Sequence, residues 1–320
     1  MCPDSDKWLV IVNIFAASKR AGSLWKKAAA MLDAASVSYA VRFTGGDDNA
    51  TALARKAAQE GFRKFVAVGG DGTIHDVLNG IAGYVSDSSD ISLDEFTLAV
   101  LPVGSGNDWI KSTGVPKKMS KAVELVARGR TTRQDVVKVS VLEDEKVVFD
   151  SYMANIGGIG LDARVAEIVN RKKEQGKRGR MLYVSALIYC IKHRVPVQAK
   201  VICDGKVIFD GKYLSMAFGT GKYSGGGMRQ TPLAVMDDGL LEVVVISDIS
   251  MWIIARKAPR LFTGTFHKVD VLTQARCREV LILPYGPADA EPIEVDGEII
   301  GRAPVRMTVL PDQINIISNL

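Results

Sequence analysis

Val66-Ala67-Val68-Gly69-Gly70-Asp71-Gly72-Thr73-Ile74 is the stretch of sequence that decides the fold. An apolar run ends abruptly at two glycines, and an acid, a third glycine and a threonine follow. Apolar residues then recur with the spacing of one helix face, at Ile74, Val77, Leu78 and Ile81. The pattern predicts a buried strand, a tight turn and a helix. In open α/β folds such turns lie at the carboxyl edge of the sheet, where ligands bind.

The composition of this turn favours phosphate as the ligand. Gly69, Gly70 and Gly72 let backbone N–H groups approach a phosphate without a Cβ in the way, and the helix N-terminus behind them adds its positive dipole end. Asp71 is the unusual member, because a carboxylate repels a phosphate. It fits if it binds Mg²⁺, orients a hydroxyl group or accepts its proton. The alternative is an ordinary strand-to-helix turn with a capping Asp.

A second stretch, Leu101-Pro102-Val103-Gly104-Ser105-Gly106-Asn107-Asp108, repeats the arrangement of a buried strand followed by a glycine loop and a helix. Ser105 and Asn107 can donate hydrogen bonds to phosphate oxygens, and Asp108 can cap the helix or bind a metal ion. One Gly-x-Gly is a weak signal. Two such loops on neighbouring strands of one sheet are a stronger one.

These two stretches resemble the signature blocks of the diacylglycerol-kinase-like lipid kinases. That family includes sphingosine and ceramide kinases and soluble bacterial lipid kinases, and it shares a superfamily with NAD kinase and phosphofructokinase. Sphingosine kinases usually have alanine at the position of Asp108, so its acid favours the diacylglycerol and bacterial branch. The resemblance extends over nearly the whole chain, through Asn155–Asp162, Gly225–Met228 and Pro232–Leu240. It implies ATP and Mg²⁺ as cofactors.

The resemblance also implies nucleotide contacts nearer the N-terminus. Asn13 begins a turn that meets the nucleotide in the family, but the family's proline and glycine are replaced here, and either Lys19 or Arg20 could meet phosphate. Thr44 matches a position that lines the nucleotide. The expected nucleotide-binding set is Asn13, Lys19, Thr44, Gly69, Gly70, Gly72, Thr73, Gly104, Ser105, Gly106 and Asn107.

Several acids gain expected roles from the same resemblance. Asp135 matches a third acid that would join Asp71 and Asp108 in a metal-and-water network. Asp238 lies in an acidic loop before a strand, which suits a structural cation. Glu298 belongs to an Asp-Gly-Glu block that the family places at the cleft between domains, facing the first glycine loop. Glu298 is therefore the candidate general base, with Asp71 as its rival. The plainer interpretation of Asp135 is a turn residue before a strand. The plainer interpretation of Glu298 is a solvated acid in a hairpin.

The order of the predicted elements divides the chain near residue 135. Residues 1–135 alternate strand and helix, which predicts an α/β domain with a parallel sheet and helices on both faces. From 136 to 305 strand-like runs dominate, with helical stretches around 163–194 and 251–262. The resemblance implies a NAD kinase/phosphofructokinase-like first domain and a β-sandwich second domain. It also implies that a final strand, about 306–320, returns to the first domain.

The bulk composition narrows the class of protein. A net charge of +5 is too mild to argue for a nucleic-acid partner, but it suits a nucleotide or an anionic membrane surface. The four cysteines show neither metal-site nor disulfide spacing, so a cytoplasmic protein is expected. Basic residues between Arg171 and Arg180 precede the apolar run Met181–Ile191, which is too short to span a bilayer. They suggest peripheral docking on anionic lipid at the inner membrane face; the alternative is an ordinary helix with a solvated end.

The sequence therefore predicts an ATP- and Mg²⁺-dependent lipid kinase that transfers the γ-phosphoryl group to a lipid hydroxyl. The lipid is diacylglycerol-like, or a sphingoid base, ceramide or phosphatidylglycerol. One alternative is a NAD kinase-type phosphotransferase. The other alternative is a lipid-sensing protein that has lost catalysis. The altered turn at Asn13 is the feature that supports it. The choice of lipid and the formation of a homodimer stay open.

Overall fold

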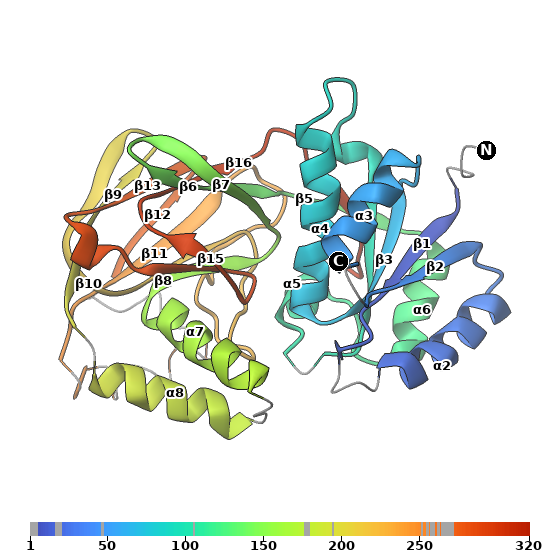
Figure 1. Cartoon of the computed structure of the whole chain (residues 1–320), viewed down its shortest axis with the longest axis horizontal. Coiled ribbons are helices and arrows are strands. Elements are labelled where there is room, and N and C mark those ends of the chain that lie inside the picture. Colours follow the sequence, from blue (N-terminus) through green and yellow to red (C-terminus); the bar gives the residue numbers. More distant parts are fainter. Residues whose placement is uncertain are drawn as a thin grey trace. The chain divides into compact units, whose positions relative to one another are not determined.

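A computed structural model gives the structure of the chain (Figure 1). It describes residues 6–16, 21–45, 48–104, 106–175, 180–193, 195–250, 252–253, 256, 260, 263 and 272–320. The chain forms two compact units. The first unit comprises Met1–Val136, Gly225–Gly227 and Leu310–Leu320, and the second comprises Val137–Ser224 and Met228–Val309.

The first unit is built on a sheet with the strand order β2-β1-β3-β4-β17-β5 in the described part of the chain. The strands are β1 (Trp8–Val12), β2 (Tyr39–Phe43), β3 (Lys64–Gly69), β4 (Thr97–Pro102), β5 (Thr131–Gln134) and β17 (Ile314–Ile317). Strands β1 to β4 and β17 are parallel, and β5 is antiparallel to β17. The apolar runs of β1, β3 and β4 are buried because helices cover both faces of the sheet.

Two pairs of helices make these covering layers. Helices α3 (Ala50–Gln59) and α4 (Asp71–Ser86) pack together on one face, and α2 (Ala21–Ala34) and α6 (Met119–Arg128) pack together on the other (Figure 1). The short η1 (Leu93–Glu95) precedes β4, and α5 (Asp108–Thr113) follows it. The predicted parallel α/β domain is confirmed.

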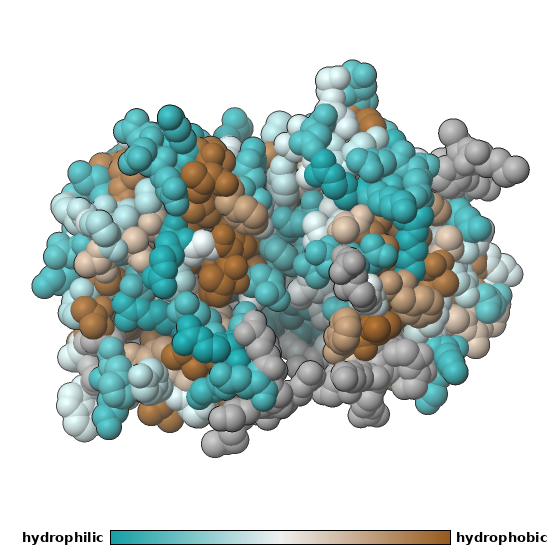
Figure 2. All heavy atoms as spheres, in the orientation of Figure 1, coloured by the Kyte–Doolittle hydropathy of each residue, from teal (hydrophilic) through white to brown (hydrophobic). Residues whose placement is uncertain are grey.

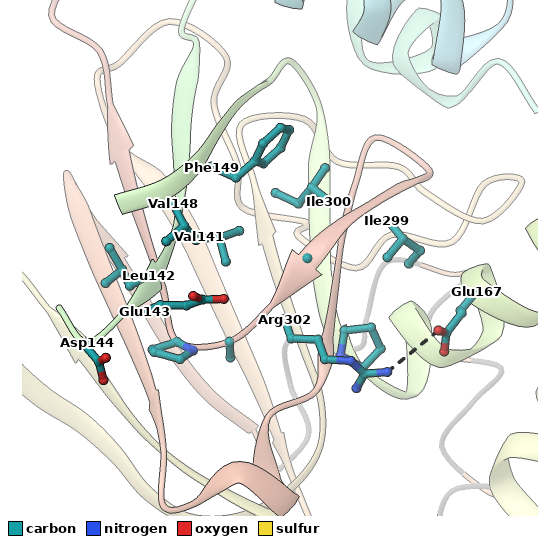
Figure 3. Close-up of a pocket in the computed structure, with 14 residues that line it drawn as sticks. Val141, Leu142, Glu143, Asp144, Val148, Phe149, Glu167, Ile299, Ile300 and Arg302 are labelled. Carbon is teal, nitrogen blue, oxygen red and sulfur yellow. Dashed lines mark ion pairs between the residues drawn. The ribbon is translucent and has the colours of Figure 1, made fainter. Parts of the chain in front are cut away.

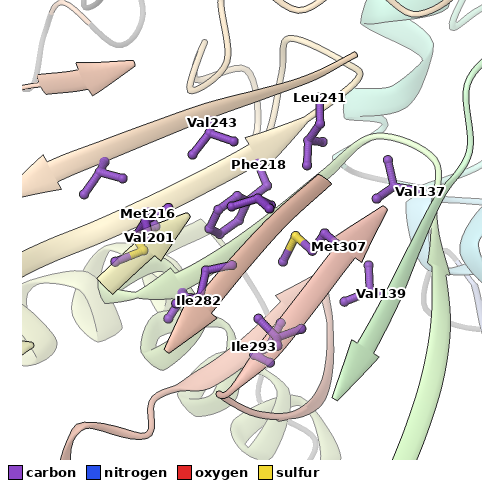
Figure 4. Packing of buried hydrophobic residues seen from close by; sticks show 14 of the residues in the cluster. Val137, Val139, Val201, Met216, Phe218, Leu241, Val243, Ile282, Ile293 and Met307 are labelled. Atoms are coloured by element: carbon purple, nitrogen blue, oxygen red, sulfur yellow. The ribbon is translucent and has the colours of Figure 1, made fainter. Parts of the chain in front are cut away.

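The second unit is a large antiparallel sheet with the order β15-β14-β8-β10-β9-β13-β16-β6-β7, and β11 and β12 extend it from β10. Its strands are β6 (Val137–Glu143), β7 (Lys146–Met153), β8 (Ile156–Gly160), β9 (Val197–Cys203), β10 (Lys206–Gly219), β11 (Leu241–Ser247), β12 (Leu272–Cys277), β13 (Glu279–Pro284), β14 (Pro292–Val295), β15 (Glu298–Arg302) and β16 (Val305–Val309), with η3 (Pro287–Asp289) before β14. Alternate side chains of these strands point into one core, which includes Val139, Val201 and Phe218 (Figure 4). The mostly-β second domain is thereby confirmed.

Two helices accompany this sheet. Helices α7 (Leu161–Glu174) and α8 (Arg180–Lys192) pack against each other through Val165, Val169, Ala186 and Cys190. Part of the basic stretch before α8, including Lys177 and Arg178, lies outside the described residues. No helix in the described ranges combines the length and the apolar character needed to cross a lipid bilayer.

Three details differ from the sequence prediction. The apolar run 147–156 is two strands, β7 and β8, separated at Ala154 and Asn155. Strand β16 belongs to the second sheet, so the chain returns to the first unit at Leu310 rather than near 306. Strands β5 and β12 carry polar residues and were not predicted. Most of the helical stretch expected around 251–262 lies outside the described residues.

Candidate phosphate-binding site and proton acceptor

The first glycine loop joins β3 to α4 as the sequence predicts. Gly69 must be glycine because an added Cβ would lie 2.1 Å from the Thr73 hydroxyl oxygen. The Gly70 carbonyl accepts the first helical hydrogen bonds, from Thr73 N at 3.0 Å and Ile74 N at 3.2 Å. The loop thus presents the N-terminus of a sixteen-residue helix, which includes Gly72, at the carboxyl end of a parallel strand. This is a geometry that binds anions.

The second glycine loop follows the neighbouring strand β4 and touches the first. A Cβ on Gly104 would come within 2.7 Å of the Gly70 Cα, so the two loops meet backbone to backbone. Asn107 adopts a left-handed conformation (φ +50°), and its side-chain amide donates to the Gly104 carbonyl oxygen at 2.7 Å. That bond fixes the turn into α5. Ser105, which was predicted to meet phosphate, lies outside the described residues.

Asp71 links the two loops. Its carboxylate accepts hydrogen bonds from the backbone N–H groups of Asp108 and Trp109, both at 3.1 Å, and so caps α5 rather than its own helix. The capping role considered from the sequence concerned the helix that follows Asp71, whereas the structure shows Asp71 bonded to the first residues of α5.

Asp108 is buried and is also held by protein groups. Its Oδ1 accepts from Lys111 Nζ at 2.5 Å, and its Oδ2 accepts from Gly226 N at 2.7 Å. Gly226 lies 118 residues further along the chain, yet the short segment Gly225–Gly227 belongs to the first unit. A Cβ on Gly227 would approach Lys111 Nζ to 3.1 Å. The glycine-rich block thus contributes a backbone donor and close packing to the same group of residues.

The predicted contacts near the N-terminus join this group. The Asn13 side-chain amide donates to Thr73 Oγ1 at 3.0 Å, and the Asn13 backbone N–H donates to the Val68 carbonyl at 3.2 Å. Thr44 is buried, and its hydroxyl accepts from the backbone N–H of Ile14 at 3.2 Å. Asn13, Thr44 and Thr73 therefore form one connected polar edge. Lys19 and Arg20 lie outside the described residues.

The two acids beside Gly106 offer the oxygen ligands that Mg²⁺ prefers. A Cβ on Gly106 would lie 3.1 Å from Asp71 Oδ2 and 4.0 Å from Asp108 Oδ2, so both carboxylates lie close to the Gly106 backbone. Carboxylate oxygens are chemically suited to a hard cation, and Mg²⁺ binding by Asp71 and Asp108 stays a prediction. Asp135 is buried, and the side-chain amide of Gln313 donates to it at 2.7 Å. Its place in a shared network with Asp71 and Asp108 stays a prediction.

Glu298, the predicted proton acceptor, belongs to the second unit and opens β15 after a tight turn. Asp296 (φ +52°) and Gly297 (φ +99°) make the two-residue turn that joins β14 to β15. The Asp296 carboxylate accepts from the backbone N–H groups of Ala154, Asn155 and Ile156 at 2.8, 2.9 and 3.1 Å. The turn is therefore fastened to the start of β8, which positions Glu298.

Two partly buried carboxyl groups, those of Glu294 and Asp162, lie near this turn. Burial raises the pKa of Glu294 well above its usual range, and the carboxylates of Asp296, Asp162 and Glu298 raise it further. Burial likewise raises the pKa of Asp162, whose Oδ2 accepts from the Ser215 hydroxyl at 2.7 Å. Both acids are expected to hold protons more firmly than a solvated carboxylate does. Neither residue was given a role from the sequence.

Asp238, the predicted cation ligand, accepts from the backbone N–H of Leu240 at 3.1 Å and pairs with Arg276. The nearby Glu242 is almost fully buried; its Oε2 accepts from Leu233 N at 2.7 Å, and its Oε1 has no partner within the described ranges. No set of three or more His, Cys, Asp and Glu side chains among the described residues forms a metal site. Asp238 as a cation ligand stays a prediction.

Glu242 makes the stability of the protein depend on pH. Burial raises its pKa from 4.5 to about 7, so between these values the folded state binds more protons than the unfolded state and stability falls as pH rises. We expect Glu242→Gln to gain stability over the wild type between pH 5 and 8, by at most about 3 kcal/mol. Urea unfolding of both proteins at the two pH values measures this difference. If the difference in unfolding free energy between the two proteins were the same at pH 5 and pH 8, the pKa of Glu242 would not be raised by folding.

Two family models match the chain. Residues 7–139 match the diacylglycerol kinase catalytic domain, and residues 156–318 match the YegS C-terminal NAD kinase beta sandwich-like domain. The chain belongs to the diacylglycerol-kinase-like lipid kinase family. The resemblance stated from the glycine blocks is confirmed.

Individual members of this lipid kinase family are similar to the chain over most of their length. The "Probable lipid kinase YegS-like" of Stenotrophomonas maltophilia strain K279a is 26% identical, over 88% of this chain and 86% of that protein. The "Diacylglycerol kinase" of Mycobacterium tuberculosis strain H37Rv is 25% identical, over 87% of this chain and 84% of that protein. A crystal structure of a diacylglycerol kinase from Bacillus anthracis strain Sterne superposes on this chain with a TM-score of 0.70. The superposition covers 98% of this chain and 97% of that chain at 21% identity, which shows a shared fold.

At the glycine loops of this lipid kinase family member, the sequence analysis missed Lys111, and it named the block that contains Gly226 without predicting its contact with Asp108. The spacing of Asp108 and Lys111, three residues apart on a predicted helix, was the available signal for Lys111. The contact of Gly226 with Asp108 had no local signal, because the two residues are 118 positions apart in sequence. The described members of the expected nucleotide-binding set do come together in the first unit, and their role toward ATP stays a prediction.

Proposed function

We propose that this protein is an ATP-dependent lipid kinase that phosphorylates the hydroxyl group of a neutral, diacylglycerol-like lipid. The observation that carries the proposal is the contact of two glycine loops at the ends of neighbouring parallel strands, with Asp71 and Asp108 beside Gly106. Family membership supports the same chemistry. Sphingoid bases, ceramide and phosphatidylglycerol are the other lipid acceptors to test.

Each group has a defined task in this proposal. Backbone N–H groups of the loops and the N-terminus of α4 bind the phosphates, and Asn13 orients the Thr73 hydroxyl toward the first loop. Asp71 and Asp108 would hold Mg²⁺, which neutralises phosphate charge when bound. Glu298 accepts the proton of the lipid hydroxyl, because a carboxylate bound to a cation is a weaker base.

A direct assay distinguishes the three functions. Purified protein is incubated with γ-labelled Mg²⁺·ATP and, separately, dioleoylglycerol, sphingosine, ceramide, phosphatidylglycerol or NAD, and products are separated by thin-layer chromatography. We expect labelled phosphatidate. Label on NAD alone would assign a NAD kinase. The absence of label from every acceptor would favour a lipid-sensing protein without catalysis.

We also propose peripheral docking on anionic membranes through the outer side of α8. Val184, Ile188 and Tyr189 are 40%, 60% and 55% exposed there, and Arg171 on α7 is exposed as well. An apolar surface beside basic residues suits anionic lipid. We expect Val184→Ser with Ile188→Ser to reduce co-sedimentation with phosphatidylglycerol vesicles several-fold, and salt to reduce wild-type binding. Val207→Ser, a similarly exposed valine on β10, is the control. Equal binding of all three proteins would reject this surface.

A further inference from the structure

A partly buried ion pair lies at the second glycine loop. Lys111 Nζ lies 2.5 Å from Asp108 Oδ1, and the two side chains are 24% and 9% exposed. Among the described residues, this is the least exposed pair of a lysine and a carboxylate. Asp108 is also one of the two acids proposed to hold Mg²⁺. The Lys111 ammonium therefore occupies an oxygen that a divalent cation would need.

Other ion pairs of the chain are of a different kind. In the groove that the edge strands β7 and β15 line, Arg302 pairs with Glu167 at 3.8 Å, and the two side chains are 57% and 36% exposed (Figure 3). Hydrophilic side chains cover much of the surface in Figure 2, and solvent screens charges in such positions. Exposed pairs of this kind contribute little to stability. Asp108 is largely removed from solvent, so the charge of its partner has a stronger effect there.

The two oxygens of Asp108 are held by groups of different mobility. Oδ2 accepts from the backbone N–H of Gly226 at 2.7 Å, and two backbone hydrogen bonds between Ser224 and Met228, at 3.0 and 2.9 Å, close the turn around that glycine. Oδ1 accepts from an ammonium group at the end of a flexible four-carbon side chain. Lys111 can therefore leave Oδ1 by rotating its side chain, while Gly226 keeps the carboxylate in place.

A second carboxylate makes the charge of Lys111 matter. Asp71 Oδ2 and Asp108 Oδ2 both lie close to the Gly106 backbone, and like charges near each other repel. Lys111 offsets part of this repulsion, and a divalent cation would offset more of it. We propose that Lys111 neutralises Asp108 until a divalent cation displaces it from Oδ1, and that the cation therefore binds together with the nucleotide. The triphosphate supplies the negative charge that the displaced ammonium and the cation together require. This inference rests on the proposed function for its nucleotide.

Binding of Mn²⁺, a paramagnetic substitute for Mg²⁺, tests the exchange without relying on catalysis. Electron paramagnetic resonance gives the dissociation constant of Mn²⁺ for the wild type, Lys111→Met and Lys111→Arg, without nucleotide and at one ionic strength. We expect Lys111→Met to bind Mn²⁺ at least about tenfold more tightly than the wild type, because the competing charge is gone. Lys111→Arg should bind Mn²⁺ no more tightly than the wild type, because it keeps that charge. With a non-hydrolysable ATP analogue present, the difference between the wild type and Lys111→Met should narrow.

Lys121→Met is the matched control. Lys121 pairs with Glu124, three residues further along α6 in the same unit, and its loss should leave the Mn²⁺ affinity unchanged. The gain in Lys111→Met should disappear when Asp108→Asn is added. Equal or weaker Mn²⁺ binding by folded Lys111→Met would show a structural role only and would overturn the inference. If Lys111→Met does not fold, Lys111→Gln, a second neutral variant, decides by the same criterion.

The lipid assay separates this inference from the proposed function. Tighter Mn²⁺ binding by Lys111→Met, together with no phosphorylated acceptor in the wild type, would reject the kinase and keep the exchange at Asp108. Phosphorylated lipid, together with an unchanged Mn²⁺ affinity in Lys111→Met, would keep the kinase and reject the exchange.

Discussion

Glu298→Gln is expected to lower kcat by at least about a hundredfold while leaving the affinity for Mg²⁺·ATP nearly unchanged. A lipid alcohol is too weak an acid to ionise at neutral pH, so its proton must leave as the new P–O bond forms. The amide keeps the size of the carboxylate but cannot accept that proton. Steady-state assays with dioleoylglycerol give kcat, and calorimetry gives the nucleotide dissociation constant.

The structure supplies a control for this variant. Glu145, in the β6–β7 turn of the same sheet, is an exposed carboxylate at positive φ, and Glu145→Gln should keep full activity. The Asp296 bonds that fasten the Glu298 turn do not involve the Glu298 side chain, so the variant should fold normally. If Glu298→Gln kept its kcat but lost affinity for ATP, Glu298 would be a nucleotide ligand. The base assignment would then move to Asp71.

Asp71→Asn is expected to lose at least about a hundredfold in turnover and to bind Mg²⁺·ATP more weakly. The amide loses the negative charge that would hold the cation. It also exchanges one of two acceptor oxygens for a donor that faces Asp108 N or Trp109 N, which should cost about 1–3 kcal/mol of stability. Turnover against Mg²⁺ concentration and urea unfolding measure the two effects separately.

A second variant shows whether stability alone explains the loss. Asn49 caps α3 in the same unit, where its side chain accepts from Ala52 N at 2.8 Å, and Asn49→Ala should cost about 1 kcal/mol. It should keep its activity because it removes a cap and nothing from the glycine loops. Near-wild-type turnover in folded Asp71→Asn would leave Asp71 with its capping role only.

The sequence could predict the local features of the candidate site and not its long-range ones. Gly69, Gly70 and Gly104 were identifiable because a buried strand, a glycine loop and a helix are contiguous in sequence. The capping of α5 by Asp71 was not identifiable, because the helix that a carboxylate caps depends on which loops meet in space. Periodicity carries no such information.

The second unit shows the same limit. Alternating apolar residues predicted most of its strands, but not that β15 and β7 end the strand order and line one groove. The bonds of the Asp296 carboxylate were not predictable either, because Ala154 and Asn155, which donate to it, lie more than a hundred residues earlier. Tertiary packing sets the pairing order of the strands and the partners of turn acids. A local sequence pattern carries no information about that packing.

The position of β17 has a consequence for folding during synthesis. This strand lies between β4 and β5, parallel to the first and antiparallel to the second, yet it follows Gln134 by about 180 residues. At about 5–20 residues per second, a ribosome needs roughly 10–40 s to add that length. Throughout this interval the outer edge of β4 lacks its neighbour, and exposed edges invite pairing with other chains. The unit that is synthesised first therefore completes its sheet last, and β4 keeps an unpaired edge until β17 has been made.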